Sequence, residues 1–312
     1  LAADPDTVLA RQVRVMYDCA RGGIDGVQWT REAKAYPLAV LAASNNFKGS
    51  TTGLPCAMRG YDAVMRSDTT AAAAGRRWSA TSGLASALIA RNRSSAAIAL
   101  LDSSMARGWG GGAYFLAAAP VYPEFRARAM EIARRDEESY GPAYANAPSS
   151  IRMWQLGILE SVIGRRDVAQ KVEAQLVARA ASSGLNSDRR FARSIAAFNS
   201  LARGDSSKAA AILDSLLREP VPSGEIVWDM GAPRGLERLT LARLHASRGD
   251  YRKAIDIANV FDAAWPSIYM LYVPASLQLR IDAAQKLGGS GLVTRYRDRL
   301  AAMRGEKAVA GK

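Results

Sequence analysis

Arginine is the residue through which this sequence could do most of its chemistry. Its guanidinium group is planar, stays charged, and donates paired hydrogen bonds to carboxylates and phosphates. The 312 residues include 42 Lys and Arg against 29 Asp and Glu, a formal net charge of +13. This excess favours an acidic partner, such as an acidic peptide, a nucleic acid or an anionic lipid. Because the arginines are spread among Asp and Glu along most of the chain, a solvated surface is the stronger interpretation of this charge, and a nucleic-acid or lipid partner is not expected.

Other groups with catalytic potential lack suitable neighbours. His245 is the single histidine, and neither a second His nor a nearby Cys accompanies it, so we expect no zinc site or His-based triad. A packing or capping role near a helix C-terminus suits it better. The acidic run 136–138 follows Arg134 and Arg135, which favours ion pairs in water over acid–base catalysis. The sequence therefore predicts a chain that is not an enzyme and that needs no cofactor, metal or small-molecule substrate.

Two cysteines, Cys19 and Cys56, do not decide whether the protein occupies an oxidising or a reducing cellular compartment. They could form one disulfide, which would indicate an oxidising compartment, or remain two unpaired thiols in helical packing. No run of 18 apolar residues occurs, so we expect no transmembrane segment. The chain begins at Leu1 without Met and shows no signal sequence. We therefore expect a processed product or a piece of a longer protein, either cytoplasmic or extracytoplasmic.

The composition favours helices throughout. Hydrophobic residues make up 49% of the chain but aromatic residues only 7%, and alanine dominates the apolar set. Alanine is the strongest helix former, and it fills tight contacts between helices. Long alternating runs of Val, Ile, Thr and Tyr, which are typical of strands, are missing. The sequence therefore predicts an all-α fold.

The stretch from Gly235 to Pro266 gives the clearest element prediction, a helix, a tight turn and a second helix. Its first half places apolar residues at helical spacings, namely Leu236, Leu239, Ala242 and Leu244. Gly249 ends this helix because glycine adopts a left-handed C-cap at little cost. Asp250 is expected to cap the second helix through its carboxylate. Pro266 closes the unit, since proline cannot continue a helix.

The same arrangement recurs along the chain. Gly164, Gly204 and Gly249 each stand five residues before an alanine, and Asn92 takes the same place before Ala97. Seven residues before each of these turns the side chain is small or absent: Ala85, Gly157, Ala197 and Ala242. Helices of a hairpin approach closely only where side chains are small, so these positions have a packing cause. The spacing predicts an irregular repeat of helix pairs.

One of these hairpins resembles the tetratricopeptide repeat family. The pair Leu241-Ala242, the turn Gly249-Asp250-Tyr251, Ala254 and Pro266 match the pattern of that family. The other units match in part, because none has the tyrosine and only Gly204-Asp205 repeats the aspartate. The resemblance implies a right-handed α-α superhelix, a solenoid of helical hairpins, over residues 57–304. An N-terminal helical segment over 1–56 and a tail over 305–312 complete the expected organisation.

The C-terminal part is also similar to repeat regions of bacterial signalling proteins. The stretch from Val260 to Leu279 and the run Tyr296–Leu300 look like regions that follow a serine/threonine kinase or transcriptional-activator domain. This likeness implies a sensor or scaffold module of a larger bacterial regulatory protein. Neither catalytic module is present in the sequence.

The repeat also implies where a partner would bind. First helices of such stacks line the concave surface, and this position selects six arginines as candidate contacts to an acidic protein or peptide segment: Arg76, Arg77, Arg189, Arg190, Arg193 and Arg238. We therefore expect a non-enzymatic protein–protein interaction module that holds its partner by shape and by arginine–carboxylate pairs. The alternative function is a structural subunit of a larger multi-protein or surface assembly.

Overall fold

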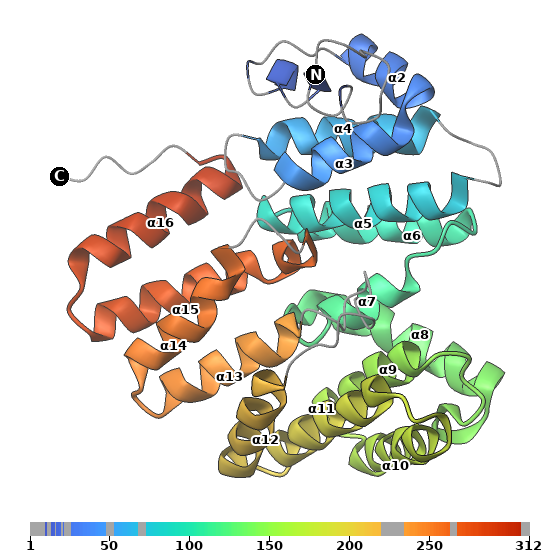
Figure 1. The fold of residues 1–312 in the computed structure, drawn as a ribbon, viewed down its shortest axis with the longest axis vertical. Helices are drawn as coiled ribbons and strands as arrows, with labels where there is room; N and C mark the ends of the chain where they lie inside the picture. Colours follow the sequence, from blue (N-terminus) through green and yellow to red (C-terminus); the bar gives the residue numbers. More distant parts are fainter. Residues whose placement is uncertain are drawn as a thin grey trace. The chain divides into compact units, whose positions relative to one another are not determined.

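The structure is a computed structural model, and it describes residues 10, 14–15, 17–19, 21, 26–47, 53–67, 73–219, 234–262 and 267–306. Every regular element in this part of the chain is a helix, so the all-α prediction is confirmed (Figure 1). The chain divides into two compact units, one made of Leu1–Gly111 with Asn259–Lys312 and the other of Gly112–Ala258. The expected closing role of Pro266 lies outside the described residues.

Unit 1 combines N-terminal and C-terminal helices. Its elements are α2 (Gly26–Ala35), α3 (Pro37–Phe47), α4 (Leu54–Ser67), α5 (Ala74–Ala90), α6 (Ser94–Ala106), η5 (Asn259–Asp262), η6 (Ser267–Leu271), α15 (Val273–Lys286) and α16 (Ser290–Arg304). Helix α3 begins at Pro37, which cannot continue the preceding helix α2. Pro274 stands in the first turn of α15, as expected for a residue that lacks the backbone N–H which a helix interior requires.

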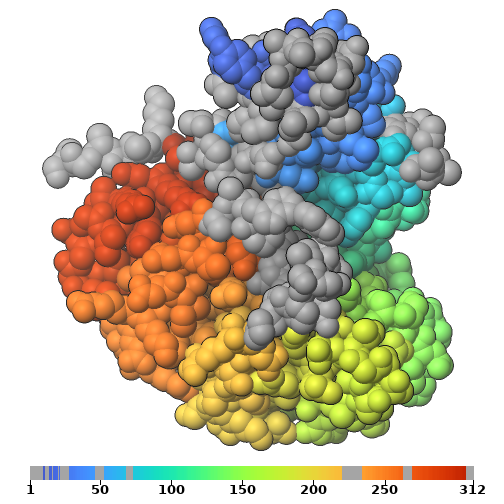
Figure 2. Space-filling view, in the orientation of Figure 1, coloured from blue at the N-terminus to red at the C-terminus, as the bar shows by residue number. Residues whose placement is uncertain are grey.

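Unit 2 is formed by one stretch of the sequence, Gly112–Ala258. Its elements are α7 (Gly112–Ala118), η2 (Pro123–Phe125), α8 (Arg126–Tyr140), η3 (Pro142–Tyr144), α9 (Ser150–Val162), α10 (Arg166–Ser183), α11 (Asn186–Ala202), α12 (Ser206–Arg218), α13 (Gly235–Ser247) and α14 (Tyr251–Ala258). Helix α11 contacts α9, α10 and α12, and α12 contacts α13. In the space-filling view the atoms of α11 and α12 form one continuous surface (Figure 2).

The four predicted turns are confirmed, and they share one geometry. Asn92, Gly164, Gly204 and Gly249 all have positive φ, between +56° and +86°. After each turn the next backbone N–H donates to the carbonyl five residues earlier, at 2.8–2.9 Å, as Arg93 does to Leu88. This bond satisfies a carbonyl that the end of a helix would otherwise leave without a partner. The same bond recurs at Gly288, which joins α15 to α16.

The alanines at fixed offsets from these turns are buried, as the packing explanation requires. Ala97, Ala169, Ala209 and Ala254 are all fully buried, and so are Ala85, Ala197 and Ala242 at the earlier small position. Gly157 occupies that position in α9, where an added Cβ would lie 2.4 Å from Cδ1 of Ile195 on α11. The small residues therefore mark the places where neighbouring helices come closest.

Unit 1 also contains a contact between distant parts of the chain. Helix α5 contacts η6 and α15, which follow it by well over a hundred residues in the sequence. An open stack of hairpins, in which each unit contacts only its neighbours, does not predict such a contact. The helical-pair repeat therefore coexists in unit 1 with a non-neighbour contact, and the right-handed superhelix stays a prediction.

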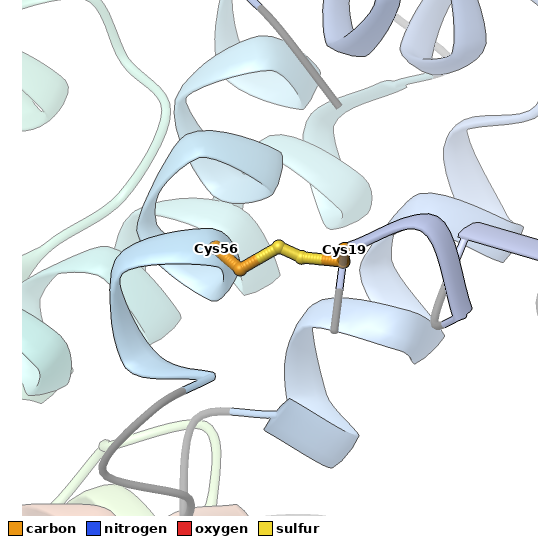
Figure 3. Close-up of a disulfide and its surroundings, with 2 residues drawn as sticks. All are labelled: Cys19 and Cys56. Atoms are coloured by element: carbon orange, nitrogen blue, oxygen red, sulfur yellow. A yellow bond between two sulfur atoms is a disulfide. The ribbon is translucent and has the colours of Figure 1, made fainter. Parts of the chain in front are cut away.

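A disulfide joins Cys19 to Cys56 at the start of α4 (Figure 3). The two Cα atoms are 6.1 Å apart, within the range that a disulfide spans. Both cysteines are buried in the same apolar cluster as Trp29 and Tyr61. The bond therefore ties the N-terminal segment to the core of unit 1.

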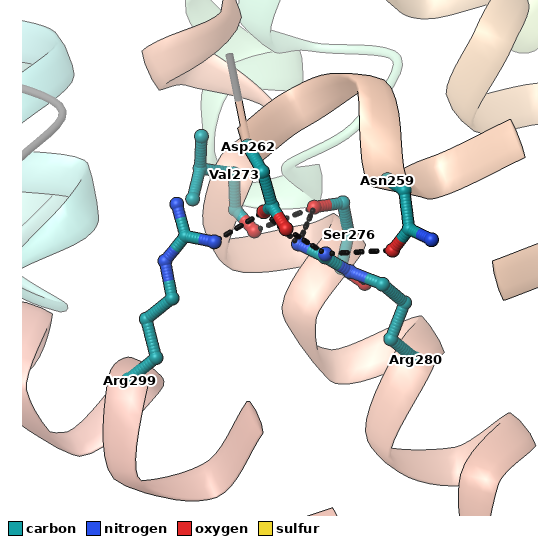
Figure 4. Close-up of polar contacts among 6 residues, drawn as sticks. All are labelled: Asn259, Asp262, Val273, Ser276, Arg280 and Arg299. Atoms are coloured by element: carbon teal, nitrogen blue, oxygen red, sulfur yellow. Dashed lines mark hydrogen bonds and ion pairs between the residues drawn. The ribbon is translucent and has the colours of Figure 1, made fainter. Parts of the chain in front are cut away.

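A buried arginine holds η5 against the C-terminal hairpin. The Arg280 side chain is completely buried, and its Nη1 and Nη2 donate to the two carboxylate oxygens of Asp262 at 2.8 and 2.9 Å (Figure 4). Arg299 on α16 also pairs with Asp262, and Asn259 accepts a hydrogen bond from Arg280. Burial alone would raise the pKa of Asp262, but the bonds and charges of Arg280 and Arg299 outweigh burial and lower it.

Candidate functional site: an arginine cluster on helices α11 and α13

Four arginines meet in unit 2, and together they form what we call the arginine cluster: Arg190 and Arg193 on α11, Arg234 at the start of α13, and Arg238 on α13. Arg190, Arg193 and Arg234 contact Glu219, the residue that ends α12. Arg238 stands four residues after Arg234 on α13. Arg193 pairs with Oε1 of Glu219 and donates to Oγ of Ser215 at 3.0 Å. Nε of Arg190 is 3.7 Å from Oε2 of the same glutamate. Two guanidinium groups thus share one carboxylate.

Arg234 is the most buried member of the cluster. It caps α13 with a left-handed backbone (φ +52°), and its side chain bonds the carbonyl oxygens of Leu216 and Glu219 at the end of α12. Burial lowers the pKa of Arg234, and the charge of Arg190 lowers it further. The charges of Arg238 and Arg193 act on the pKa of Arg234 in the same direction.

A buried carboxylate lies beneath the cluster. Glu237 on α13 is only 2% exposed, and its Oε1 accepts a hydrogen bond of 2.6 Å from Ser194 on α11. Ser194 in turn accepts a bond of 2.9 Å from the indole Nε1–H of Trp154 on α9. Burial raises the pKa of Glu237, while the bond from Ser194 and the charges of Arg234 and Arg238 oppose that rise. Glu237 is thus an internal counter-charge rather than a group that a ligand touches.

The edge of the cluster is open to solvent. The side chains of Arg193 and Glu219 are 33% and 35% exposed, whereas that of Arg190 is 14% exposed. A second carboxylate can therefore approach Arg193 from solvent and find a guanidinium whose orientation is already fixed. Charge-assisted bonds to a preorganised arginine are strong and directional, so the chemistry of this edge suits an anionic group.

Of the six arginines that the sequence selects, the structure brings Arg190 and Arg193 together at Glu219. Arg238 lies on α13, four residues after Arg234. Arg189 is exposed and contacts Asn186 of its own helix, Nη1 to Oδ1 at 3.4 Å. Arg76 and Arg77 belong to α5 in unit 1, where Arg77 is buried with its guanidinium 4.9 Å from the centre of the Trp109 ring. Sequence reasoning missed Arg234, because the residues before Gly235 carry no helical periodicity.

The acidic residues 136–138 on α8 only partly form the solvent-exposed ion pairs that the sequence predicts. Glu138 pairs with Arg134 where both side chains are exposed, as predicted. Asp136 instead pairs with Arg152 on α9 at 2.7 Å, with both side chains largely buried. Glu137 pairs with Arg165 at 2.9 Å. The last two pairs therefore join separate segments of unit 2, and the prediction of ion pairs in water is wrong for Asp136.

His245 lies near the C-terminus of α13, as expected, and it is 8% exposed. Its Nδ1 is 3.3 Å from Oδ2 of Asp250, across the Gly249 turn. The Asp250 carboxylate therefore contacts His245, whereas Asp205 at the equivalent turn caps its helix by accepting from the N–H of Lys208 at 2.9 Å. Among the described residues, no three or more His, Cys, Asp or Glu side chains are grouped to hold a metal ion.

No family model and no curated protein matches this chain. Within the part of the chain that the structure describes, no helix has both the length and the apolar character needed to cross a membrane.

Proposed function

We propose that this chain is a non-enzymatic helical-repeat module that binds an acidic segment of a partner protein at the arginine cluster. The observation that carries the proposal is the shared carboxylate of Glu219. Arg190 and Arg193 already hold that group at a partly exposed position. A carboxylate from a partner has the same chemistry, and it would find the same donors.

The charge balance of the cluster supports an anionic ligand. Four guanidinium groups face two carboxylates, those of Glu219 and Glu237, and burial raises the pKa of Glu237. The cluster therefore carries an excess of positive charge that an acidic segment would neutralise. Because salt screens charges on an exposed edge, binding should weaken as ionic strength rises.

We further propose that the helix pairs form a superhelix of the tetratricopeptide type. The shared geometry at Asn92, Gly164, Gly204 and Gly249 supports a repeated unit. Trp154, Ser194 and Glu237 come from the first helices of three successive hairpins, and one chain of hydrogen bonds joins them. First helices would then line a common surface, in the manner of a scaffold or sensor module within a larger bacterial regulatory protein.

Selection from a displayed library of random peptides tests the proposed function. The wild-type chain should enrich sequences with clustered Asp and Glu. A variant with Arg190→Gln, Arg193→Gln and Arg238→Gln should lose that enrichment, provided that its circular dichroism shows intact helices. Enrichment of the same sequences by both proteins, or of sequences without acidic residues by the wild type, would rule out the arginine cluster as the binding site.

A further inference from the structure

A pocket of about 470 Å³ opens in unit 1, among α4, α5, α6 and the residues that follow α6. Its apolar wall includes Met65 on α4 and Leu100 on α6. Two arginines, Arg66 and Arg107, line its exposed rim together with Trp109. Pockets of this volume, with an apolar wall and a few polar groups, are typical of sites that hold small molecules.

The two rim arginines differ in what neutralises them. Arg66 pairs with Asp62 on its own helix, with Nε 2.9 Å from Oδ2. Arg107 has no acidic partner among the described residues, and its guanidinium lies 4.9 Å from the centre of the Trp109 ring. The guanidinium of Arg77 lies at the same distance from that ring. The indole therefore orients Arg107 while leaving its charge uncompensated.

A buried hydroxyl lies next to this charge. Ser104 is 3% exposed and lines the pocket, and its Oγ has no hydrogen-bond partner among the residues that the structure describes. Buried hydroxyl groups almost always have a partner, so this one points to a missing acceptor. Ser104 and Arg107 are three residues apart at the end of α6, a spacing that places both on one side of a helix.

We propose that this pocket binds a small organic acid, with its carboxylate held by Arg107 and Ser104 and its apolar body against Met65 and Leu100. A carboxylate oxygen is the acceptor that Ser104 lacks, and it supplies the negative charge that Arg107 lacks. The ligand is bound and not converted. This inference is independent of the arginine cluster, which belongs to the other unit.

The test is a titration with 3-phenylpropionate, followed through the side-chain N–H signal of Trp109 in a two-dimensional ¹H–¹⁵N NMR spectrum. The Trp109 signal is identified as the side-chain N–H signal that is missing from the spectrum of the Trp109→Phe variant. The expected result is a saturable shift of that signal. Two probes should bind at least about tenfold more weakly: 3-phenylpropanamide, which lacks the charge, and acetate, which lacks the apolar body. Equal binding of either probe, or no saturable shift, overturns the proposal.

Variants locate the binding within the pocket. Arg107→Gln should weaken the binding of 3-phenylpropionate at least about tenfold, because it removes the charged donor. Leu100→Trp should weaken it similarly by filling the pocket while leaving Arg107 in place. Arg135→Gln, at an exposed arginine of α8, is the matched control and should bind like the wild type. Unchanged binding in a folded Arg107→Gln or Leu100→Trp protein would overturn the assignment, as would an equal loss in the control.

Discussion

Ser194 on α11 donates its hydroxyl hydrogen to Oε1 of Glu237 on α13 across 2.6 Å. The same hydroxyl oxygen accepts from the indole of Trp154 on α9 at 2.9 Å. One serine thus joins the first helices of three successive hairpins, directly beneath the arginine cluster. In a low-dielectric interior such a chain of bonds stabilises the packing only if each polar group has its partner.

Ser194→Ala should therefore destabilise the protein by about 1–3 kcal/mol, because it leaves the Trp154 N–H and an oxygen of Glu237 buried without a partner. Urea denaturation followed by circular dichroism measures the difference. Ser182→Ala is the control, since Ser182 is exposed and its loss should change stability by no more than about 0.5 kcal/mol. If both variants unfold at the same urea concentration, the buried chain of bonds has no structural role.

The turns of this fold were predictable because they depend on local chemistry. Glycine takes a positive φ at little cost, and asparagine takes it more readily than most residues, and Asn92, Gly164, Gly204 and Gly249 all have a positive φ. The small residues seven positions earlier were predictable because neighbouring helices approach closely only where side chains are small, and at Gly157 these neighbours are both α10 of the same hairpin and α11 of the next one. The contact of α5 with α15 was not predictable, because no spacing within the sequence encodes it.

Gly157→Ala tests the close packing that the repeat requires. Alanine is a better helix former than glycine, so propensity alone predicts a gain in stability. At Gly157, however, the new Cβ would overlap Ile195, and we expect a loss of about 1–3 kcal/mol. Gly75→Ala on α5 is the matched comparison, because nothing lies within 4 Å of a Cβ built there. Chemical denaturation should give opposite signs for the two changes, and a stabilised Gly157→Ala protein would refute close packing at this position.

Loss of the disulfide should destabilise unit 1. Cys19 and Cys56 are 37 residues apart, and the entropy of closing such a loop corresponds to about 3–4 kcal/mol. We expect Cys19→Ser to lower the melting temperature, and reductant to lower that of the wild type but not that of the variant. A thiol assay on unreduced, denatured protein checks the bond itself. Two reactive thiols per chain in that assay would show that the bond is not formed.

The pair of Arg280 and Asp262 predicts a dependence of stability on pH. Asp262→Asn leaves a buried guanidinium without its carboxylate and should lower the free energy of unfolding by about 2–4 kcal/mol at pH 7. This loss is smaller than the loss on breaking a fully buried ion pair, because the Asp262 side chain is one-third exposed. The pKa of Asp262 is lowered in the folded state. Its contribution is therefore complete above the unfolded pKa of about 4 and is lost as the pH falls through the folded value.

Urea denaturation of the wild type and of Asp262→Asn from pH 7 to pH 3 measures this dependence. The two unfolding free energies should converge as the pH falls. Asp256→Asn, at an exposed position of α14, is the control and should cost no more than about 0.5 kcal/mol at pH 7. A difference between wild type and Asp262→Asn that grows at acid pH would contradict the sign of the shift.

The arginine cluster was only partly predictable. Arg190, Arg193 and Arg238 were selected by their place in first helices, but the same rule also selected Arg189, which contacts its own helix instead. Position within a repeat does not fix which way a long side chain points. Arg234 was missed because its place depends on a left-handed residue at the start of α13, and no local pattern signals such a residue when it is not glycine.

The binding of an acidic peptide tests the central claim most directly. Fluorescence anisotropy of a labelled peptide of alternating glutamate and glycine would be compared among the wild type, the double variant Arg193→Gln/Arg238→Gln, and the double variant Arg134→Gln/Arg135→Gln. The last of these removes the same charge from exposed positions of α8 in the same unit. We predict that the Kd rises at least about tenfold in Arg193→Gln/Arg238→Gln and stays within about twofold of the wild-type value in Arg134→Gln/Arg135→Gln. The Kd of the wild type should rise as the salt concentration rises. Equal Kd values in the two variants, or no binding by the wild type at low salt, would contradict the assignment of partner binding to the arginine cluster.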